Sequence, residues 1–402
     1  MSKNTKSFPG QPVLAQIFPL ISRDLVSKIV SEGQYDRYYK KFKTHDHLLS
    51  MLYCVVSGST SLREVVTGLM AFGTRLKHLG LKYFPRRSTL SEANTNRNSE
   101  VFGKIYYALL QRYLPVLPDS RGGHRFLKDL YVIDSSTISL FKAILKCVGR
   151  KPKSGRSKGG IKVHVMMKFT DLLPHFIKFS SASRHDRRFL DHINLKKGAI
   201  VAFDKAYNDY KLFAKWSQKG IRFVTRMKKN AVFSVVETFG ISSLNTGIIL
   251  KDQLIELDLG AERDPLRLRR IEYYDETMDK TLVFLSNILD LNADKVALIY
   301  KCRWEIECLF KRLKQNFPLK YFLGDTPNAL EIQIWVSLIA NLLYEVISKG
   351  LSRRWAFSNM CSMIRIHLAS YINLWVFLND PEASWRKICD SGGRQLSLFE
   401  DG

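Results

Sequence analysis

Residues 300–314 read Tyr300-Lys-Cys-Arg-Trp-Glu-Ile-Glu-Cys-Leu-Phe-Lys-Arg-Leu-Lys314. Tyr300, Arg303, Glu307 and Lys314 stand at offsets 0, 3, 7 and 14 in this stretch. At about 100° per residue these offsets are nearly whole turns, so the spacing predicts that the four side chains share one helix face. The opposite face carries Leu298, Cys302, Ile306, Leu309 and Leu313. We therefore expect one long amphipathic helix over residues 292–315 that packs on a sheet and presents a polar stripe.

Two aspartates elsewhere follow short apolar runs that we expect to be strands. Asp134 ends Leu130-Tyr-Val-Ile-Asp, and Asp204 ends Ala199-Ile-Val-Ala-Phe-Asp. An isolated aspartate in such a place is more often a turn or cap residue. Open sheets, however, present ligands at the carboxyl ends of their strands. Together with Glu307 on the polar helix face, the pattern favours a phosphate-handling site in which carboxylates bind metal and Tyr300, Arg303 and Lys314 grip the phosphates.

The pattern Tyr-x2-Arg-x3-Glu-x6-Lys resembles the YREK signature of the IS-four family of bacterial insertion-sequence transposases, which belong to the DDE class. The resemblance extends over residues 129–335. It includes the motifs Val132-Ile-Asp-Ser-Ser, Gly159-Gly-Ile-Lys-Val-His, Phe203-Asp-Lys-Ala-Tyr, Phe284-Leu-Ser-Asn and Asn328-Ala-Leu-Glu-Ile-Gln-Ile-Trp. Two departures are Ala206, where the family often has glycine, and the lack of a tryptophan between residues 217 and 303. In some relatives a tryptophan of that region stacks on a flipped base, so here Tyr273, Tyr274 or Phe233 would have to serve, or that step differs.

The resemblance implies an α/β fold: a ribonuclease H-like catalytic core interrupted by a β-rich insertion, with helical N-terminal and C-terminal regions. It also implies that Asp134, Asp204 and Glu307 are the catalytic and metal-binding acids, with Asp134 bridging. Three carboxylates without His or Cys suit the hard cation Mg²⁺, for which Mn²⁺ can substitute. Two such ions roughly 3.5–4 Å apart can drive an in-line displacement at phosphorus.

Periodicity and composition divide the chain into seven segments. They are a helical N-terminal domain (1–75), a helical DNA-binding or connecting region (76–128), the first half of the core (129–229), the β-rich insertion (230–290), the second half of the core with the polar helix (291–330), a helical C-terminal region (331–390) and a flexible tail (391–402).

The chain carries 63 Lys plus Arg against 37 Asp plus Glu, a net charge of +26. Such an excess indicates a polyanionic partner, nucleic acid before an anionic membrane, and argues against an ordinary small-metabolite enzyme. Residues 142–168 form a glycine-rich basic stretch without acids, which we expect to track a DNA backbone rather than serve only as a solvated surface. Its candidate contacts include Lys151, Lys153, Arg156 and Lys158.

Nothing in the sequence favours a membrane or an oxidising compartment. The apolar segment 332–347 is interrupted by polar residues and shorter than the roughly 18–20 apolar residues of a membrane span. The N-terminus lacks a secretory signal, and the six cysteines are scattered without metal-binding spacing. We expect a bacterial cytoplasmic, nucleoid-associated protein.

Three features leave alternatives open. The helix predicted after Pro85 could present Arg86, Arg87, Asn94, Asn96 and Arg97 to a DNA groove, as a helix-turn-helix does, or could have a solvated face. Lys162 and His164 share one face of a predicted strand, where they contact DNA or water. Trp304 is expected in the core, with stacking on a base as the alternative.

The end of the chain, Gln395-Leu-Ser-Leu-Phe399, follows a glycine-rich joint. It resembles the peptide by which bacterial proteins dock on the replication sliding clamp, and a frayed amphipathic end is the alternative. The residues that would bind the clamp are Gln395, Leu396, Leu398 and Phe399.

Taken together, the sequence predicts a transposase that binds the terminal inverted repeats of an insertion sequence and target DNA as a dimer. It would catalyse metal-dependent cleavage and strand transfer. The alternatives are a transposase-derived DNA-binding protein that no longer cuts and a metal-dependent nuclease without strand transfer.

Overall fold

The computed structural model describes residues 10–73, 78–117, 125–139, 149–150, 158–181, 186–241, 248–258, 265–319, 321, 323–383 and 386. The chain divides into two compact units. The sheet unit is Pro118–Lys311, and the helical unit is Met1–Leu117 together with Arg312–Gly402. Each unit is described by itself.

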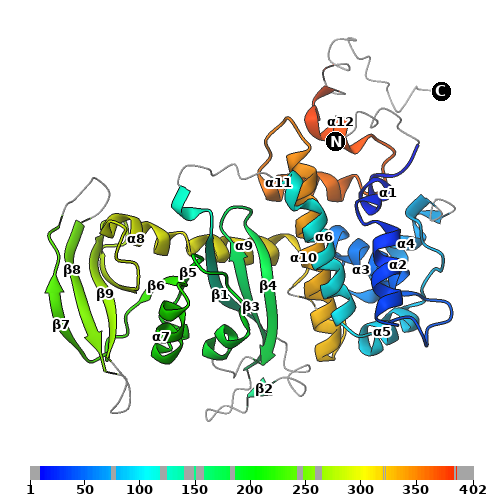
Figure 1. Ribbon diagram of the computed structural model, residues 1–402. Coiled ribbons are helices and arrows are strands. Elements are labelled where there is room, and N and C mark those ends of the chain that lie inside the picture. Colours follow the sequence, from blue (N-terminus) through cyan, green and yellow to red (C-terminus); the bar gives the residue numbers. More distant parts are fainter. Residues whose placement is uncertain are drawn as a thin grey trace, which may run out of the picture. The chain divides into compact units, whose positions relative to one another are not determined.

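The sheet unit is built on a ten-stranded sheet in which β4 pairs only with β3 (Figure 1). The remaining strands follow the order β2-β3-β1-β5-β6-β10-β9-β8-β7. The strands are β1 (Leu130–Ser139), β2 (Gly149–Arg150), β3 (Lys158–Lys168), β4 (Leu173–Ser181), β5 (Ile200–Phe203), β6 (Arg222–Arg226), β7 (Phe233–Thr238), β8 (Ile248–Leu257), β9 (Leu266–Asp275) and β10 (Lys280–Ser286).

The centre of this sheet is parallel. β1 pairs with β5 and β5 with β6 in parallel, whereas β3 runs antiparallel to β1. All four residues of β5 are buried, as a continuous apolar run predicts for an internal parallel strand. Helix α7 (Tyr210–Gln218) packs Phe213 and Trp216 into the same core, where the Phe213 ring stacks on Phe223 of β6 at 4.3 Å.

The β-rich stretch after residue 230 continues this sheet. β10 pairs antiparallel with β6, and β9, β8 and β7 follow outward as antiparallel neighbours (Figure 1). This stretch therefore supplies the hydrogen-bonding partner of β6, so that strand is internal rather than an edge.

The single helix expected over residues 292–315 is wrong. Helix α8 (Ala293–Lys301) ends before a turn at residues 302–303, and α9 (Trp304–Asn316) begins after it. The backbone N–H groups of Arg303, Glu305 and Ile306 bond to carbonyls three residues back, which winds the chain more tightly than an α-helix. Arg303 therefore lies in the turn between the two helices.

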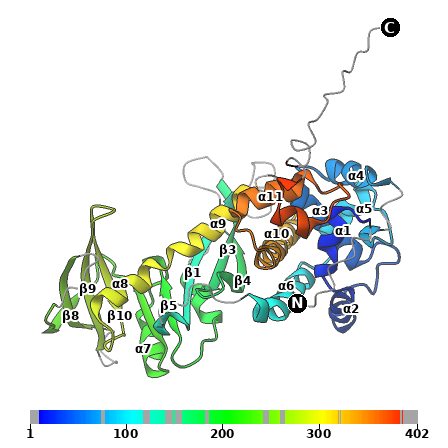
Figure 2. The ribbon, with the colours of Figure 1, turned by 90° about the horizontal axis from the view of Figure 1, so that it is seen from above.

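The helical unit is centred on α10 (Pro327–Lys349), which contacts α3 (Thr44–Ser57), α6 (Glu100–Tyr113) and α5 (Arg87–Asn96) (Figure 2). Its other helices are α1 (Val13–Ile17), α2 (Arg23–Glu32), α4 (Leu62–Met70), α11 (Phe357–Ile366) and α12 (Leu374–Asn379). Among the described helices, α10 is the only one with the length and hydropathy of a membrane span, and 89% of its most apolar window is buried within the protein. Its apolar surface thus forms the core of this unit.

The helix after Pro85 does not present all its candidate DNA contacts outward. Asn94 at the end of α5 is 0% exposed and Arg97 is 1% exposed. Arg97 forms an ion pair with Asp36 at 2.5 Å, donates to the carbonyl of Phe42 at 2.7 Å, and also contacts the Thr44 hydroxyl. Because these partners lie more than fifty positions away in sequence, the polar pattern alone did not reveal them.

This buried ion pair leads to a stability prediction. Arg97→Ala should lower the free energy of unfolding by about 3 kcal/mol, because it leaves the Asp36 carboxylate without its cation and the Phe42 carbonyl without a donor. Chemical denaturation followed by circular dichroism measures the effect. Arg87→Ala, at an exposed position of the same helix, should change the free energy by no more than about 0.5 kcal/mol. An equal loss in both variants would contradict the structural role of Arg97.

Candidate active site

The register of the parallel strands brings two aspartates and an arginine together. Ile133 of β1 is opposite Phe203 of β5, which is opposite Thr225 of β6. The next residue on the three strands is Asp134, Asp204 and Arg226, so their side chains leave the sheet at adjacent places. The expectation that Asp134 ends its strand is wrong: β1 continues to Ser139 because it remains paired with β3. Asp134 lies where the pairing with β5 stops.

Arg303 joins Asp134 to Glu307. Its guanidinium donates to Asp134 Oδ2 and to Glu307 Oε1, each at 2.7 Å. The Arg303 side chain is 13% exposed, so one buried cation is shared by acids that lie 173 positions apart in the sequence (307 − 134). The turn between α8 and α9 places Arg303 for these contacts.

Asp204 has its own cation. Arg226 at the end of β6 donates to Asp204 Oδ2 at 2.5 Å, and the amide of Ala206 donates to Oδ1 at 3.0 Å. The buried ring of Tyr300 lies between the two arginines, 5.6 Å from the Arg303 guanidinium and 6.0 Å from that of Arg226. Sequence reasoning missed Arg226. The available signal was a strand that ends in arginine beside one that ends in aspartate.

The surroundings shift the pKa values of Asp134 and Asp204 in opposite directions. Burial raises the pKa of Asp134 to about 6, and Glu307 and Asp204 add to the rise, although Arg303 opposes it. Burial acts in the same direction on Asp204, but the hydrogen bonds from Arg226 and Ala206 outweigh it and lower the pKa of that carboxyl. Asp134 lies close enough to Glu307 and Asp204 for their charges to raise its pKa, so the three acids form one electrostatic cluster.

The family model for the transposase DDE domain matches residues 125–343, which is more than half of the chain. The chain belongs to the DDE transposase family. Its activity is that of the family, DNA cleavage and strand transfer in transposition. A second model, a domain of unknown function named DUF4372, matches residues 9–82.

Two proteins of similar sequence agree with this assignment. The transposase is 29% identical over 268 residues to y4zB of Sinorhizobium fredii, named as a transposase, covering 66% of this chain and 72% of that one. It is 24% identical over 304 residues to the protein named as the transposase of insertion sequence element IS5377 of Geobacillus stearothermophilus. That alignment covers 74% of this chain and 75% of the other protein. A chain of the piggyBac transposase synaptic complex with hairpin DNA aligns with a TM-score of 0.45 and 11% identity, over 96% of this chain and 87% of that one.

DDE transposases generally use divalent metal ions, and the donor set here fits such ions. All three acids offer carboxylate oxygens, which hard divalent cations prefer. Asp134 and Glu307 already share one cationic group, Arg303. Among the described residues, no three His, Cys, Asp or Glu side chains stand close enough together to hold a metal as they lie. In the structure, Arg303 and Arg226 occupy carboxylate oxygens of all three acids.

The remaining predicted DNA contacts lie in different places. Lys314 is half-buried on α9, two turns beyond Glu307, and burial lowers its pKa. Lys151, Lys153 and Arg156 lie outside the described residues, as do Gln395, Leu396, Leu398 and Phe399 of the tail. Lys158 begins β3, and its side chain is not among those described.

Two further expectations are corrected. Trp304 is 55% exposed rather than in the core, because it begins α9 directly after the turn. His164 is 3% exposed and the Lys162 side chain 15%, so neither the DNA contact nor the solvated face expected for this strand describes them. Both face a buried cluster around Asp186.

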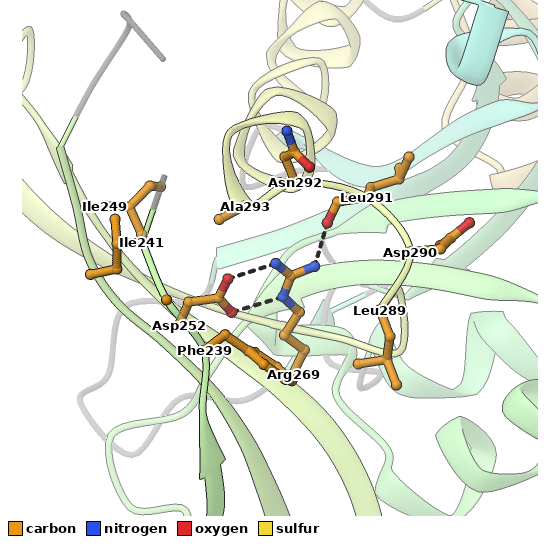
Figure 3. A pocket seen from close by; sticks show the side chains of 11 residues that line it. Phe239, Ile241, Ile249, Asp252, Arg269, Leu289, Asp290, Leu291, Asn292 and Ala293 are labelled. Carbon is orange, nitrogen blue, oxygen red and sulfur yellow. Dashed lines mark hydrogen bonds and ion pairs between the residues drawn. The ribbon is translucent and has the colours of Figure 1, made fainter. Parts of the chain in front are cut away.

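A separate cavity of about 240 Å³ lies between residues of β8 and β9 and the start of α8 (Figure 3). Arg269 extends along it and binds both oxygens of Asp252, at 2.8 and 2.6 Å, as well as the carbonyl of Leu291. None of the three acids lines the cavity. The charge of Arg269 is paired with that of Asp252.

Proposed function

We propose that this transposase cuts and joins the ends of an insertion sequence with Asp134, Asp204 and Glu307 as the catalytic acids. The observation that carries the proposal is the Arg303 bridge between Asp134 and Glu307, next to Asp204 in the strand register. These acids would hold two Mg²⁺ ions, with Asp134 as the shared ligand and Mn²⁺ as a substitute. Bound there, the ions would activate a water or a DNA 3′-hydroxyl and stabilise the leaving oxygen.

The cationic side chains have a second role in this proposal. Arg303 donates one hydrogen bond to each of two carboxylates, and the same guanidinium can donate to phosphate oxygens. When it leaves the acids, it would bind a DNA phosphate, with Tyr300 and Lys314 beside it on the same segment. The exposed indole of Trp304 would stack on a base near the cut end. The basic stretch with Lys151, Lys153, Arg156 and Lys158 would follow the DNA backbone.

The fold supports a finer assignment. The five strands β4-β3-β1-β5-β6 lie side by side in this order. Counted along the chain without the two-residue strand β2, they are the third, second, first, fourth and fifth strands. Of these five, only β3 runs antiparallel to the others. This arrangement supports a ribonuclease H-like core and, with the YREK spacing, membership of the IS-four family. Two element ends must be joined, so we propose a dimer on DNA in the bacterial cytoplasm, associated with the nucleoid.

One experiment tests the proposed function. Purified protein is incubated with Mg²⁺, linear DNA that carries the ends of the element, and a supercoiled target plasmid. We expect cuts at the ends and their covalent joining to the target. Cuts without joined products would favour a nuclease without strand transfer. Binding without cuts would favour a DNA-binding protein derived from a transposase.

We also propose that the tail docks on the bacterial sliding clamp through Gln395, Leu396, Leu398 and Phe399. A peptide of residues 391–402 should bind purified clamp in fluorescence anisotropy, because leucine and phenylalanine can fill an apolar pocket. Leu398→Ala with Phe399→Ala should reduce that binding at least about tenfold, since it removes the two apolar side chains proposed to fill the pocket. Unchanged binding of the double variant, or no binding of the original peptide, would exclude the docking role.

A further inference from the structure

A partly buried polar cluster lies beside the proposed catalytic acids and has no part in the function described so far. We call it the Asp186 cluster; its members are Ser135, Lys162, His164, Asp186 and Tyr207. They come from β1, β3, the 3-10 helix η5 (Asp186–His192) and the 3-10 helix η6 (Lys205–Tyr207). Four segments of the sheet unit thus meet at one set of hydrogen bonds.

Asp186 has the most contacts in this cluster. Its Oδ1 accepts from the Ser135 hydroxyl at 3.2 Å and from the Lys162 ammonium at 2.9 Å, and the His164 Nδ1 lies 3.7 Å away. The Asp186 side chain is 18% exposed and that of Lys162 15%. A charge pair this far from water holds its geometry firmly, because loss of either partner leaves the other charge poorly solvated.

The cluster continues to Tyr207. The Tyr207 hydroxyl lies 3.4 Å from His164 Nδ1 and also forms a hydrogen bond with the Ser135 side chain. The His164 ring is fixed on its other side by Ser180, 2.8 Å from Nε2, and stacks on Phe189 at 5.1 Å. Tyr207 is 1% exposed, so its hydroxyl depends on these partners rather than on water.

Both ends of the cluster adjoin a catalytic aspartate. Ser135 directly follows Asp134, and its backbone N–H donates to Asp134 Oδ1 at 2.8 Å. Tyr207 stands three residues after Asp204 in η6, whose first turn Asp204 itself caps through the amide of Ala206. A change in the position of Ser135 or Tyr207 would therefore move the carboxylates that leave the sheet beside them.

We propose that Asp186 is a positioning residue that sets Asp134 and Asp204 for cation binding through Ser135 and Tyr207. The inference rests on the proposed roles of Asp134 and Asp204. Residues that orient metal ligands through hydrogen bonds affect metal affinity even though they do not touch the metal, typically by about 10- to 100-fold. An ion pair that served stability alone would leave the metal affinity of the folded protein unchanged.

The test measures Mn²⁺ binding to the full-length protein without DNA. Electron paramagnetic resonance counts the free Mn²⁺ as it is titrated. Asp186→Asn should weaken binding at least about tenfold, whereas Asp191→Asn, the same substitution at an exposed position of η5, should leave it unchanged. Binding of end DNA in Ca²⁺ should stay within about twofold of wild type for both variants, since neither residue is proposed to touch DNA.

Ser135→Ala provides the second variant. It removes one hydroxyl from the cluster and keeps the Asp186–Lys162 pair, so it should fold and weaken Mn²⁺ binding in the same direction. Combined with Asp186→Asn it should add little, because the two act through one path. If Asp186→Asn fails to fold, Mn²⁺ binding by Ser135→Ala alone tests the positioning role.

The outcomes separate the two proposals. Wild-type Mn²⁺ affinity in folded Asp186→Asn or in Ser135→Ala would overturn the positioning role. If Asp134→Ala bound Mn²⁺ as tightly as wild type, the assignment of the acids would fail instead. Weaker binding in Asp186→Asn together with the same weakening in Asp191→Asn would also count against the inference, since any loss of charge on η5 would then suffice.

Discussion

Asp134→Ala is expected to reduce cleavage at the element ends at least about 1,000-fold while end binding remains. The acid lies where the β1–β5 pairing stops, beside Asp204 and bridged to Glu307 by Arg303. Its loss would remove the carboxylate proposed to be shared by both ions, and a loss of several kcal/mol of transition-state stabilisation corresponds to this factor. Single-turnover cleavage of labelled end DNA measures the rate, and gel shifts in Ca²⁺ measure the binding.

Asp129→Asn provides the control for this variant. Asp129 is exposed just before β1, at the opposite end of the strand segment that pairs with β5, so its loss should leave the cleavage rate unchanged. Cleavage that persisted in Asp134→Ala would exclude this aspartate from the catalytic acids. If a variant neither cut nor bound DNA, circular dichroism would show whether it has the fold of the wild type. Only a folded variant bears on the catalytic role of Asp134.

Arg303→Ala is expected to act in opposite directions on metal binding and on cleavage. Without DNA, Arg303 neutralises Asp134 and Glu307, so its removal should tighten Mn²⁺ binding. We expect a change of about tenfold, because a neighbouring arginine lowers the pKa of a carboxylate by about 1 to 3. With DNA, the same change removes the proposed phosphate contact. Cleavage should then fall about 100-fold, as for other donors that stabilise a developing charge. Titration of Mn²⁺ and single-turnover cleavage measure the two effects.

Lys311→Ala is the matched variant, because Lys311 is an exposed cation on α9, the helix that begins directly after Arg303. It should leave both Mn²⁺ binding and cleavage close to wild type. Loss of metal binding in Arg303→Ala would mean that the arginine supports the acids rather than competes with a metal for them. Unchanged cleavage would remove Arg303 from the proposed phosphate contacts.

Much of the sheet unit could be predicted from local patterns. Buried apolar runs ending in Asp134 and Asp204 indicated internal strands, and the mixed α/β architecture with helical flanks is observed. The partners of the strands after residue 230 could not be predicted, because alternation indicates a strand without saying which strand it joins. Nor could the break at residues 302–303, since the helical period is similar on both sides of a two-residue turn.

The candidate site, too, could be predicted only in part from local patterns. Residue type and spacing singled out Asp134, Asp204 and Glu307, but the cations that contact them depend on strand register and on the α8–α9 turn. Arg97 and His164 illustrate the limit most clearly. Both were candidates for the surface, yet each is buried against partners that only the fold supplies. A polar side chain in a pattern does not report its long-range partner.

The pairing of β10 with β6 makes residues 230–290 inseparable from the core. Excision of this stretch would expose the backbone groups along one side of β6, the strand that carries Arg226 to Asp204. This stretch is therefore unlike a domain attached by a flexible linker. Exchange of this stretch between related enzymes would succeed only if the donor supplied a last strand of matching length and register.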